Sequence, residues 1–125
     1  MYNETVTTHF RSPRHVGELP DPDAIGTAGV PGRSNYFVMH LRVRGDRICD
    51  IGFLAFGCPA SVASASMLAE MAQGLPLAEA AKITAAQVLA QLGGLPPGKR
   101  HCPARAVKAL RAALNAAADA DTTPT

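Results

Sequence analysis

The feature of this sequence that most constrains its fold is a change of hydrophobic period at Gly57. Before it, residues 36–43 alternate between apolar and mixed positions, the pattern of a strand with one buried face. Residues 48–56 form a second strand-like segment, and Gly45 and Asp46 between the two have turn chemistry. After Gly57, the apolar residues recur at helical spacing. The sequence therefore predicts a β-hairpin followed by helices.

The remaining segments fill in an α+β architecture. A short amphipathic helix over residues 3–10 is expected to form an amino-terminal arm, and residues 19–35 have turn and loop composition with room for at most a short strand. Later helices are predicted over residues 59–73, 77–83, 84–92 and 103–118. Strands before helices indicate a small antiparallel sheet with helices packed on one face.

Length and charge restrict the classes of function. A chain of 125 residues fits a single domain, here residues 1–118 with a flexible tail over 119–125. The formal net charge is +2 and the basic residues are spread out, which argues against a nucleic-acid partner. An apolar run of about 20 residues and a secretory leader are both lacking, so we expect no membrane association. The Ala- and Arg-rich composition is typical of a GC-rich bacterial source, and we expect a cytoplasmic protein with reduced or metal-bound cysteines.

Two of the three cysteines are the strongest candidates for chemistry. Cys58 and Cys102 each stand directly before a proline. Because proline is favoured at the first helical position, both cysteines are predicted to lie at the start of a helix. The unpaired backbone N–H groups there favour the thiolate, the form that binds metal or carries sulfur. His101 adds a nitrogen ligand, and a Cys/Cys/His set suits zinc, iron or an iron–sulfur cluster. Cys49 lies within a predicted strand and is interpreted as filling space.

Several ordered motifs carry a family resemblance. They are SPRHVG at 12–17, GTAG at 26–29, FGC at 56–58, ASAS at 63–66 and LPPGKRHC at 95–102. In this order the chain resembles the IscU/NifU amino-terminal family of iron–sulfur cluster scaffolds over nearly its full length. The resemblance implies a non-enzymatic α+β scaffold that builds a cluster, most simply [2Fe-2S], or holds Zn²⁺. It also implies that Cys58, His101 and Cys102 are metal ligands, and that Cys58 and Cys102 bind the cluster.

The chain departs from the family pattern before the first strand of the hairpin. The family has a Pro-x-Cys-Gly-Asp loop there, whereas this chain reads PGRSN over residues 31–35. Arg33 therefore occupies the cysteine position and Asn35 the aspartate position. A guanidinium cannot deprotonate to bind metal. Arg33, Asn35 and Lys99 are read as residues that modulate the site. Arg33 is either solvated, as loop arginines usually are, or paired with a cysteine thiolate.

Two thiolates and one imidazole cannot supply four protein ligands to a cluster, so three outcomes stay open. A homodimer could share one cluster through Cys58 and Cys102 of each subunit. A partner or a small thiol could complete the ligand set, with Arg33 offsetting negative charge. The protein could also bind no cluster and act as a metal-free regulatory relative.

The resemblance further implies partners. These are a cysteine desulfurase that supplies sulfur, apo-proteins that receive clusters, and an Hsp70-type chaperone that grips residues 95–99, where Gly98 replaces the family's valine. The main hypothesis is thus a scaffold or carrier with an atypical ligand set. The second is a sulfur-transfer protein that carries a persulfide on Cys58 or Cys102. The third is an interaction module that competes for the partners of scaffolds.

Overall fold

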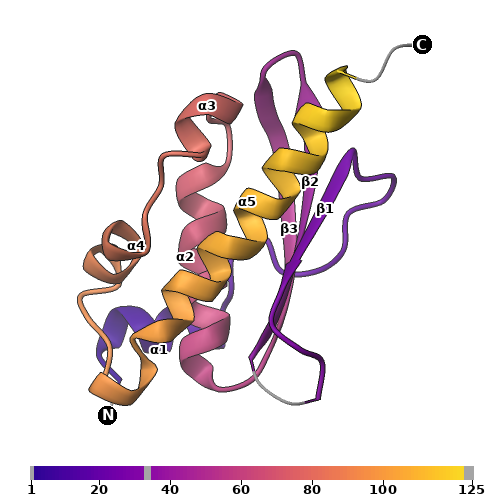
Figure 1. Cartoon of the computed structure of the whole chain (residues 1–125). Helices are drawn as coiled ribbons and strands as arrows, with labels where there is room; N and C mark the ends of the chain where they lie inside the picture. The colour runs from indigo at the N-terminus through magenta and orange to yellow at the C-terminus, as the bar shows by residue number, and fades with distance from the viewer. Residues whose placement is uncertain (1, 33–34, 123–125) are drawn as a thin grey trace.

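A three-stranded antiparallel sheet and a layer of helices make up the fold (Figure 1). The computed structural model describes residues 2–32 and 35–122, the last four by backbone alone. Arg33 and residues 123–125 of the predicted tail lie outside this description. The elements, in chain order, are α1 (Glu4–Arg11), β1 (Ala24–Ala28), β2 (Tyr36–Arg44), β3 (Arg47–Phe56), α2 (Pro59–Ala72), α3 (Leu77–Ala80), α4 (Ala85–Gln91), the 3-10 turn η1 (Pro97–Lys99) and α5 (His101–Thr122).

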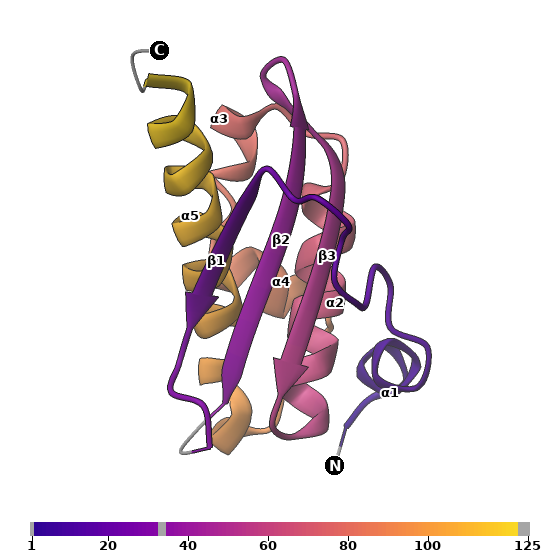
Figure 2. The same cartoon turned by 90° about the vertical axis from the view of Figure 1, so that its right-hand side faces the viewer.

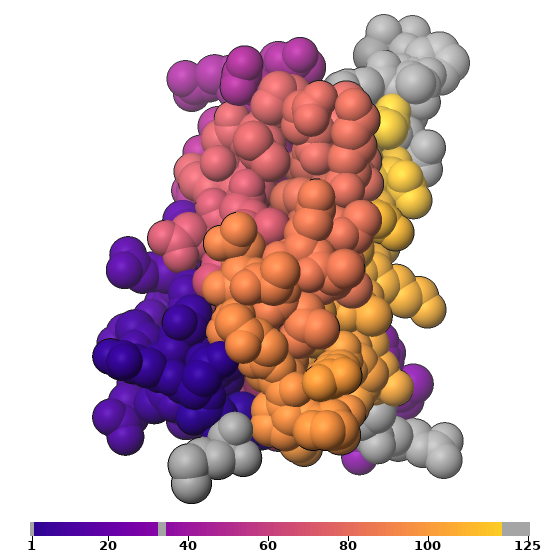
Figure 3. All heavy atoms as spheres, turned by 90° about the vertical axis from the view of Figure 1, so that its left-hand side faces the viewer, coloured from indigo at the N-terminus to yellow at the C-terminus, as the bar shows by residue number. Residues whose placement is uncertain are grey.

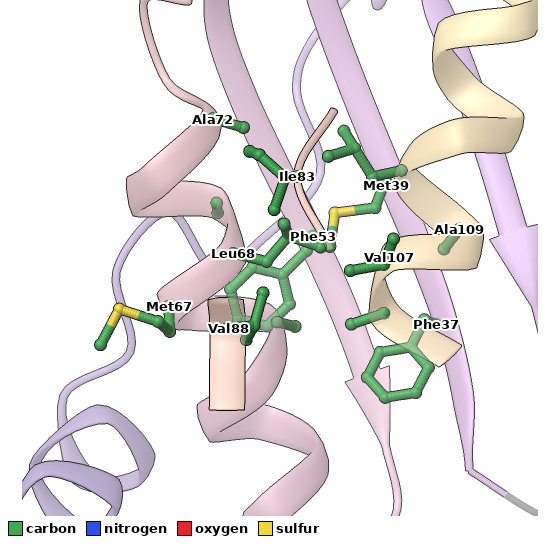
Figure 4. Close-up of a cluster of buried hydrophobic side chains, with 14 of the residues drawn as sticks. Phe37, Met39, Phe53, Met67, Leu68, Ala72, Ile83, Val88, Val107 and Ala109 are labelled. Carbon is green, nitrogen blue, oxygen red and sulfur yellow. The ribbon is translucent and has the colours of Figure 1, made fainter. Parts of the chain in front are cut away.

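The sheet has the order β1-β2-β3, and α2 and α5 cover one of its faces (Figure 2). This arrangement confirms the predicted α+β class. Alternation along β2 places Phe37, Met39 and Leu41 in the core, and Phe53 joins them from β3. Figure 4 shows these aromatic and methionine side chains packed against Leu68 of α2 and Val107 of α5. Burial of this apolar cluster is the main stabilising contribution to the domain.

Helix α2 is buried on nearly all sides and consists mainly of small residues. It packs against α1, β3, α4 and α5. Its buried residues are Ala60, Ser61, Ala63, Ser64, Ala65, Ser66, Met67, Leu68, Ala69 and Ala72. Alanine and serine let the neighbouring elements approach its backbone closely, so this helix is the central support of the helical layer.

Helix α5 lies directly on β1 at a glycine. A Cβ atom added to Gly26 would overlap the carbonyl oxygen of Ala109 and the amide nitrogen of Ala113. Only a residue without a side chain fits between this strand and the helix backbone. The contact fixes the position of α5, and with it the position of Cys102 near its start.

β1 is the short strand for which residues 19–35 left room, and its backbone pairs with β2 from Ala24 to Leu41 through Ala28 to Phe37. Some predicted helix boundaries need correction. Helix α3 ends at Ala80, earlier than residue 83. Helix α5 begins at His101 and extends to Thr122, because η1 leads directly into it. Cys102 is therefore the second residue of the helix and not its N-cap. Among the described residues, no helix is both long and apolar enough to span a membrane.

The amino-terminal arm is anchored to the rest of the protein by polar contacts. Asn3 caps α1 by accepting from the Val6 N–H at 2.9 Å, and its Nδ2 donates to the Leu92 carbonyl at 2.9 Å. His9 Nδ1 lies 2.7 Å from Ser66 Oγ, and this hydroxyl also accepts from the Arg14 N–H at 2.7 Å. Figure 3 shows the arm, in indigo, against the orange surface of α4 and the start of α5.

Candidate sulfur and metal site

Three segments that are distant in the sequence meet at one end of the molecule, the lower end in Figure 1. They are the loop that enters β2 at Asn35, the start of α2 at Cys58, and the start of α5 at His101 and Cys102. Ser61, in the first turn of α2, lies between the two thiols. Its Oγ is 3.6 Å from Cys58 Sγ and 3.7 Å from Cys102 Sγ. The structure thus places together the two cysteines that the sequence singled out.

Cys58 is the N-cap residue of α2, as predicted, and is half-buried. Its carbonyl accepts from the Ser61 N–H at 2.9 Å, which starts the helix. Burial alone would raise the pKa of the Cys58 thiol. The Ser61 hydroxyl, the backbone N–H groups of Ser61 and Ala60, and the Lys99 charge outweigh that effect and lower this pKa to about 7. About half of Cys58 is therefore thiolate near neutral pH.

Cys102 differs from Cys58 because it is fully buried, with 0% of its surface exposed. Burial raises the pKa of its thiol, and the neighbouring Cys58 raises it further, while Ser61 and Lys99 act in the opposite direction. Cys102 Sγ accepts a hydrogen bond from Asn35 Nδ2 at 3.2 Å and lies 3.9 Å from His101 Nε2. One thiol of the pair is thus accessible and acidic, and the other is enclosed and more basic.

Asn35 joins the loop to the start of α5. Its Nδ2 lies 3.4 Å from His101 Nε2 in addition to its contact with Cys102, and its carbonyl accepts from Arg105 at 3.4 Å. When the amide donates to Nε2, the imidazole carries its proton on Nδ1. The approach of Asn35 requires Gly57, because a Cβ there would overlap Asn35 Oδ1 and come within 2.9 Å of Ser61 Oγ. The Asn35 amide therefore links the loop before β2 to Cys102 and His101 at the start of α5.

Two contributors to the site were not predicted from the sequence. Ser61 stands three residues after an N-cap, a position whose side chain lies near the capping residue, so helix geometry could have indicated it. Tyr2 is close enough to Cys58 for the charge of the thiolate to act on its hydroxyl. Burial and the Cys58 charge raise the pKa of the Tyr2 hydroxyl, with Lys99 opposing. Tyr2 could not have been found from spacing alone, because the arm is brought to the site by tertiary contacts.

The donor set is incomplete as a metal centre. Among the side chains that the structure describes, those of residues 2–32 and 35–118, no three His, Cys, Asp or Glu groups surround a common point that could hold a metal ion. The assignment of Cys58, His101 and Cys102 as metal ligands stays a prediction. Lys99 is close enough for its charge to lower the pKa of both thiols, and its role as a modulating residue stays a prediction.

Cys49 lies far from the pair, near the end of α2 opposite Cys58. It is exposed, so the interpretation that it fills space in the interior is wrong. Its Sγ donates to the Arg42 carbonyl at 3.3 Å, and its own carbonyl accepts from Gln73 Nε2 at 3.0 Å. Cys49 is outside the site and provides a matched control thiol.

Comparisons with known proteins place the chain in a family. The model of the NifU-like N terminal domain matches residues 1–121. Iron-sulfur cluster assembly scaffold protein IscU 1 of Archaeoglobus fulgidus is 45% identical over 114 residues, which cover 91% of this chain and 74% of the relative. The corresponding IscU of Aquifex aeolicus is 39% identical over 115 residues, covering 90% and 73%.

Solved structures agree at the level of the fold. The crystal structure of FiSufU from Fervidobacterium islandicum AW-1 matches with a TM-score of 0.73 at 20% identity, covering 90% of this chain and 96% of that chain. A NifU-like amino-terminal structure from Brucella abortus matches with a TM-score of 0.57 at 19% identity, covering 92% and 83%. The α+β architecture agrees with these structures, the family model covers nearly the whole chain, and the chain belongs to the NifU-like N-terminal domain family.

Proposed function

We propose that this protein is a non-enzymatic scaffold or carrier that binds an iron–sulfur cluster as its cargo through Cys58 and Cys102, with His101 assisting. The observation that carries the proposal is the convergence of the two thiols on Ser61 Oγ, with the His101 imidazole beside Cys102. Thiolates are the ligands that iron–sulfur clusters use, and imidazole replaces them in some clusters. The names of the curated relatives support the same role.

A second subunit can supply the missing ligands. One chain offers two thiols and one imidazole, whereas a cluster needs four protein ligands. Cys58 is half-buried, so its sulfur is open to a group that arrives from outside. In the proposed homodimer, two such ends meet and one [2Fe-2S] cluster is shared by four thiolates. A partner protein or a small thiol could complete the set instead, and Zn²⁺ could take the same donors.

The proposed partners are a cysteine desulfurase as sulfur donor and apo-proteins as cluster acceptors, in the bacterial cytoplasm. Residues 95–99 form a candidate chaperone contact. Pro97 and Gly98 are exposed there, while Leu95 is buried. An Hsp70-type chaperone would therefore meet the η1 turn first, and would reach Leu95 only if the segment opened.

Anaerobic reconstitution with iron and sulfide tests the scaffold proposal. We expect bound iron, acid-labile sulfide and a visible spectrum, with about one cluster per dimer in native mass spectrometry. Cys58→Ser and Cys102→Ser should each abolish both counts. The control Cys49→Ser removes a thiol away from the site and should leave the counts unchanged. Equal iron and sulfide in all three variants would contradict the proposal.

A second candidate function is sulfur transfer, in which Cys58 receives a persulfide and passes it on. The observation that favours it is the position of Cys58 at a helix start, half-buried, with its pKa lowered to about 7. A thiol with a pKa near ambient pH is well suited to thiol exchange. Incubation with a desulfurase and free cysteine, followed by mapping of the labelled peptide, should place the added sulfur on Cys58. Labelling of Cys49 alone would contradict this candidate.

A further inference from the structure

We infer that Cys102 resolves a persulfide carried on Cys58, releasing the transferred sulfur as sulfide and leaving a Cys58–Cys102 disulfide. This inference rests on the second candidate function, in which Cys58 accepts the sulfur. It adds an activity to that function, because the chain would then convert bound sulfur into free sulfide with its own thiol as the reductant.

Both sulfurs contact the same hydroxyl group. Ser61 Oγ lies 3.6 Å from one sulfur and 3.7 Å from the other. Both cysteines are held at helix starts, and α2 and α5 pack against each other. A persulfide on Cys58 and the Cys102 thiol would therefore lie on either side of the Ser61 hydroxyl, and the step requires the two sulfurs to approach each other past it.

Accessibility gives the two cysteines different roles. Cys58 is half-buried, whereas Cys102 has 0% of its surface exposed. An external persulfide therefore meets Cys58 first, and the enclosed Cys102 lies beside the sulfur that Cys58 then carries. Asn35 Nδ2 donates to Cys102 Sγ at 3.2 Å, and this contact orients the enclosed sulfur. A reactive thiol beside a protected one is the arrangement of a dithiol exchange pair.

The chemistry balances without any group beyond the persulfide donor. A donor of the persulfide class first transfers its outer sulfur to Cys58, which gives Cys58–S–SH and the donor thiol. The Cys102 sulfur then attacks Cys58 Sγ. The bond between Cys58 Sγ and the outer sulfur breaks, the Cys58–Cys102 disulfide forms, and the outer sulfur leaves as HS⁻. Two electrons pass from Cys102 to the departing sulfur, and the Cys102 proton goes to HS⁻ or to solvent.

Ser61 has a positioning role in this step. Its hydroxyl lies beside both sulfurs, so it can donate to the outer sulfur as negative charge develops on it. Return of the pair to the dithiol state requires two equivalents of a small thiol, or one of a dithiol. The reaction thus produces one sulfide for each oxidation of the pair.

The test uses glutathione persulfide as the probe, without oxygen, on the full chain carrying Cys49→Ser. We expect each chain to lose two hydrogen atoms in intact mass, to contain a Cys58–Cys102 peptide link, and to release about one sulfide. Cys49→Ser/Cys102→Ser should instead gain one sulfur atom on Cys58 and release no more sulfide than the reagent alone. Far-UV circular dichroism of both proteins confirms that each is folded.

Different results separate failure of this inference from failure of the function on which it rests. Stable persulfide on Cys58 of the Cys49→Ser protein, with no disulfide, would overturn the inference and leave sulfur acceptance intact. Sulfide release from Cys49→Ser/Cys102→Ser as fast as from Cys49→Ser would also overturn it. If neither protein gains sulfur or releases sulfide, both the second candidate function and this inference are wrong.

Discussion

Replacement of Ser61 by alanine isolates the contribution of one hydroxyl to the reactivity of Cys58. A hydrogen bond to a charged group contributes about 1.5–3 kcal/mol. The separation of 3.6 Å is long and Cys58 is half-buried, so we use about 1.4 kcal/mol, which corresponds to about one pKa unit. Because the hydroxyl stabilises the thiolate, Ser61→Ala should raise the pKa of Cys58 from about 7 toward about 8.

The assay is the rate of alkylation of Cys58 as a function of pH. Cys49→Ser/Cys102→Ser leaves Cys58 as the only thiol, and Ser61→Ala is compared within this background. At about pH 7 the thiolate fraction should fall from about one half to about one tenth, so alkylation should slow about fivefold. At a pH well above both pKa values the two rates should converge, because both proteins are then fully thiolate.

The matched control is Ser64→Ala, which removes another buried hydroxyl of α2. Ser64 Oγ donates to the Ala60 carbonyl at 2.6 Å and contacts neither thiol in the described structure. This variant should leave the pKa of Cys58 unchanged. If Ser61→Ala also leaves it unchanged, the reasoning is refuted, and the backbone N–H groups at the start of α2 account for the low pKa without the hydroxyl.

Three further predictions concern packing, ligand chemistry and pH. Gly26→Ala should lower the free energy of unfolding by about 1–3 kcal/mol, because the new Cβ would overlap the backbone of α5. Denaturant titrations measure this change. The control is Gly98→Ala, where a Cβ meets open space. Asn35→Asp places a carboxylate beside Cys102 and His101 and should increase the iron retained after anaerobic reconstitution. The control Asn115→Asp, on an exposed part of α5, should not change the iron retained. Equal retention in both variants would contradict the assigned role of Asn35. Burial lowers the pKa of His9, with Glu70 opposing, so the unfolded chain takes up a proton at this residue more readily than the folded one. The associated stability is present above the unfolded pKa of about 6.5 and is lost as the pH falls below it. His9→Gln should therefore reduce the loss of melting temperature between about pH 7.5 and about pH 5.5, and an unchanged loss would show that other groups govern it.

The strands and helices that follow local patterns could be predicted from the sequence. The alternation in β2 and the Thr84 N-cap of α4 are local signals, and the structure confirms both, the latter with a capping box to Gln87. The position of β1 within residues 19–35 could not be predicted, because the sequence around Gly26 carries glycines and prolines. Its conformation depends on pairing with β2 and on the close approach of α5, which are tertiary contacts.

Only part of the candidate site could be predicted from the sequence. Helix-start chemistry and the family resemblance indicated Cys58 and Cys102, and the structure brings them together. The start of α5 was misplaced because Pro103 was read as the first helical residue, whereas η1 lets the helix begin at His101. Ser61 bridges thiols that come from different elements, so its role depends on how α2 and α5 pack.

Because α2 is enclosed, the residues of the site that lie on this helix tolerate little change in sequence, whereas the residue supplied by the loop before β2 can be replaced more easily. Four neighbouring elements surround α2, which consists mainly of alanine and serine. Because Cys58 stands at the start of this tightly packed helix, the packing of the domain interior fixes its position. Larger side chains or a shift along this helix would disturb the core before they altered the chemistry. Asn35 enters from a loop outside this helix, and its side chain contacts the thiol and the imidazole directly. We therefore expect changes in the ligand set, in evolution or in the laboratory, to be made by substitutions in the loop before β2. Cys58 at the start of α2 would stay in place.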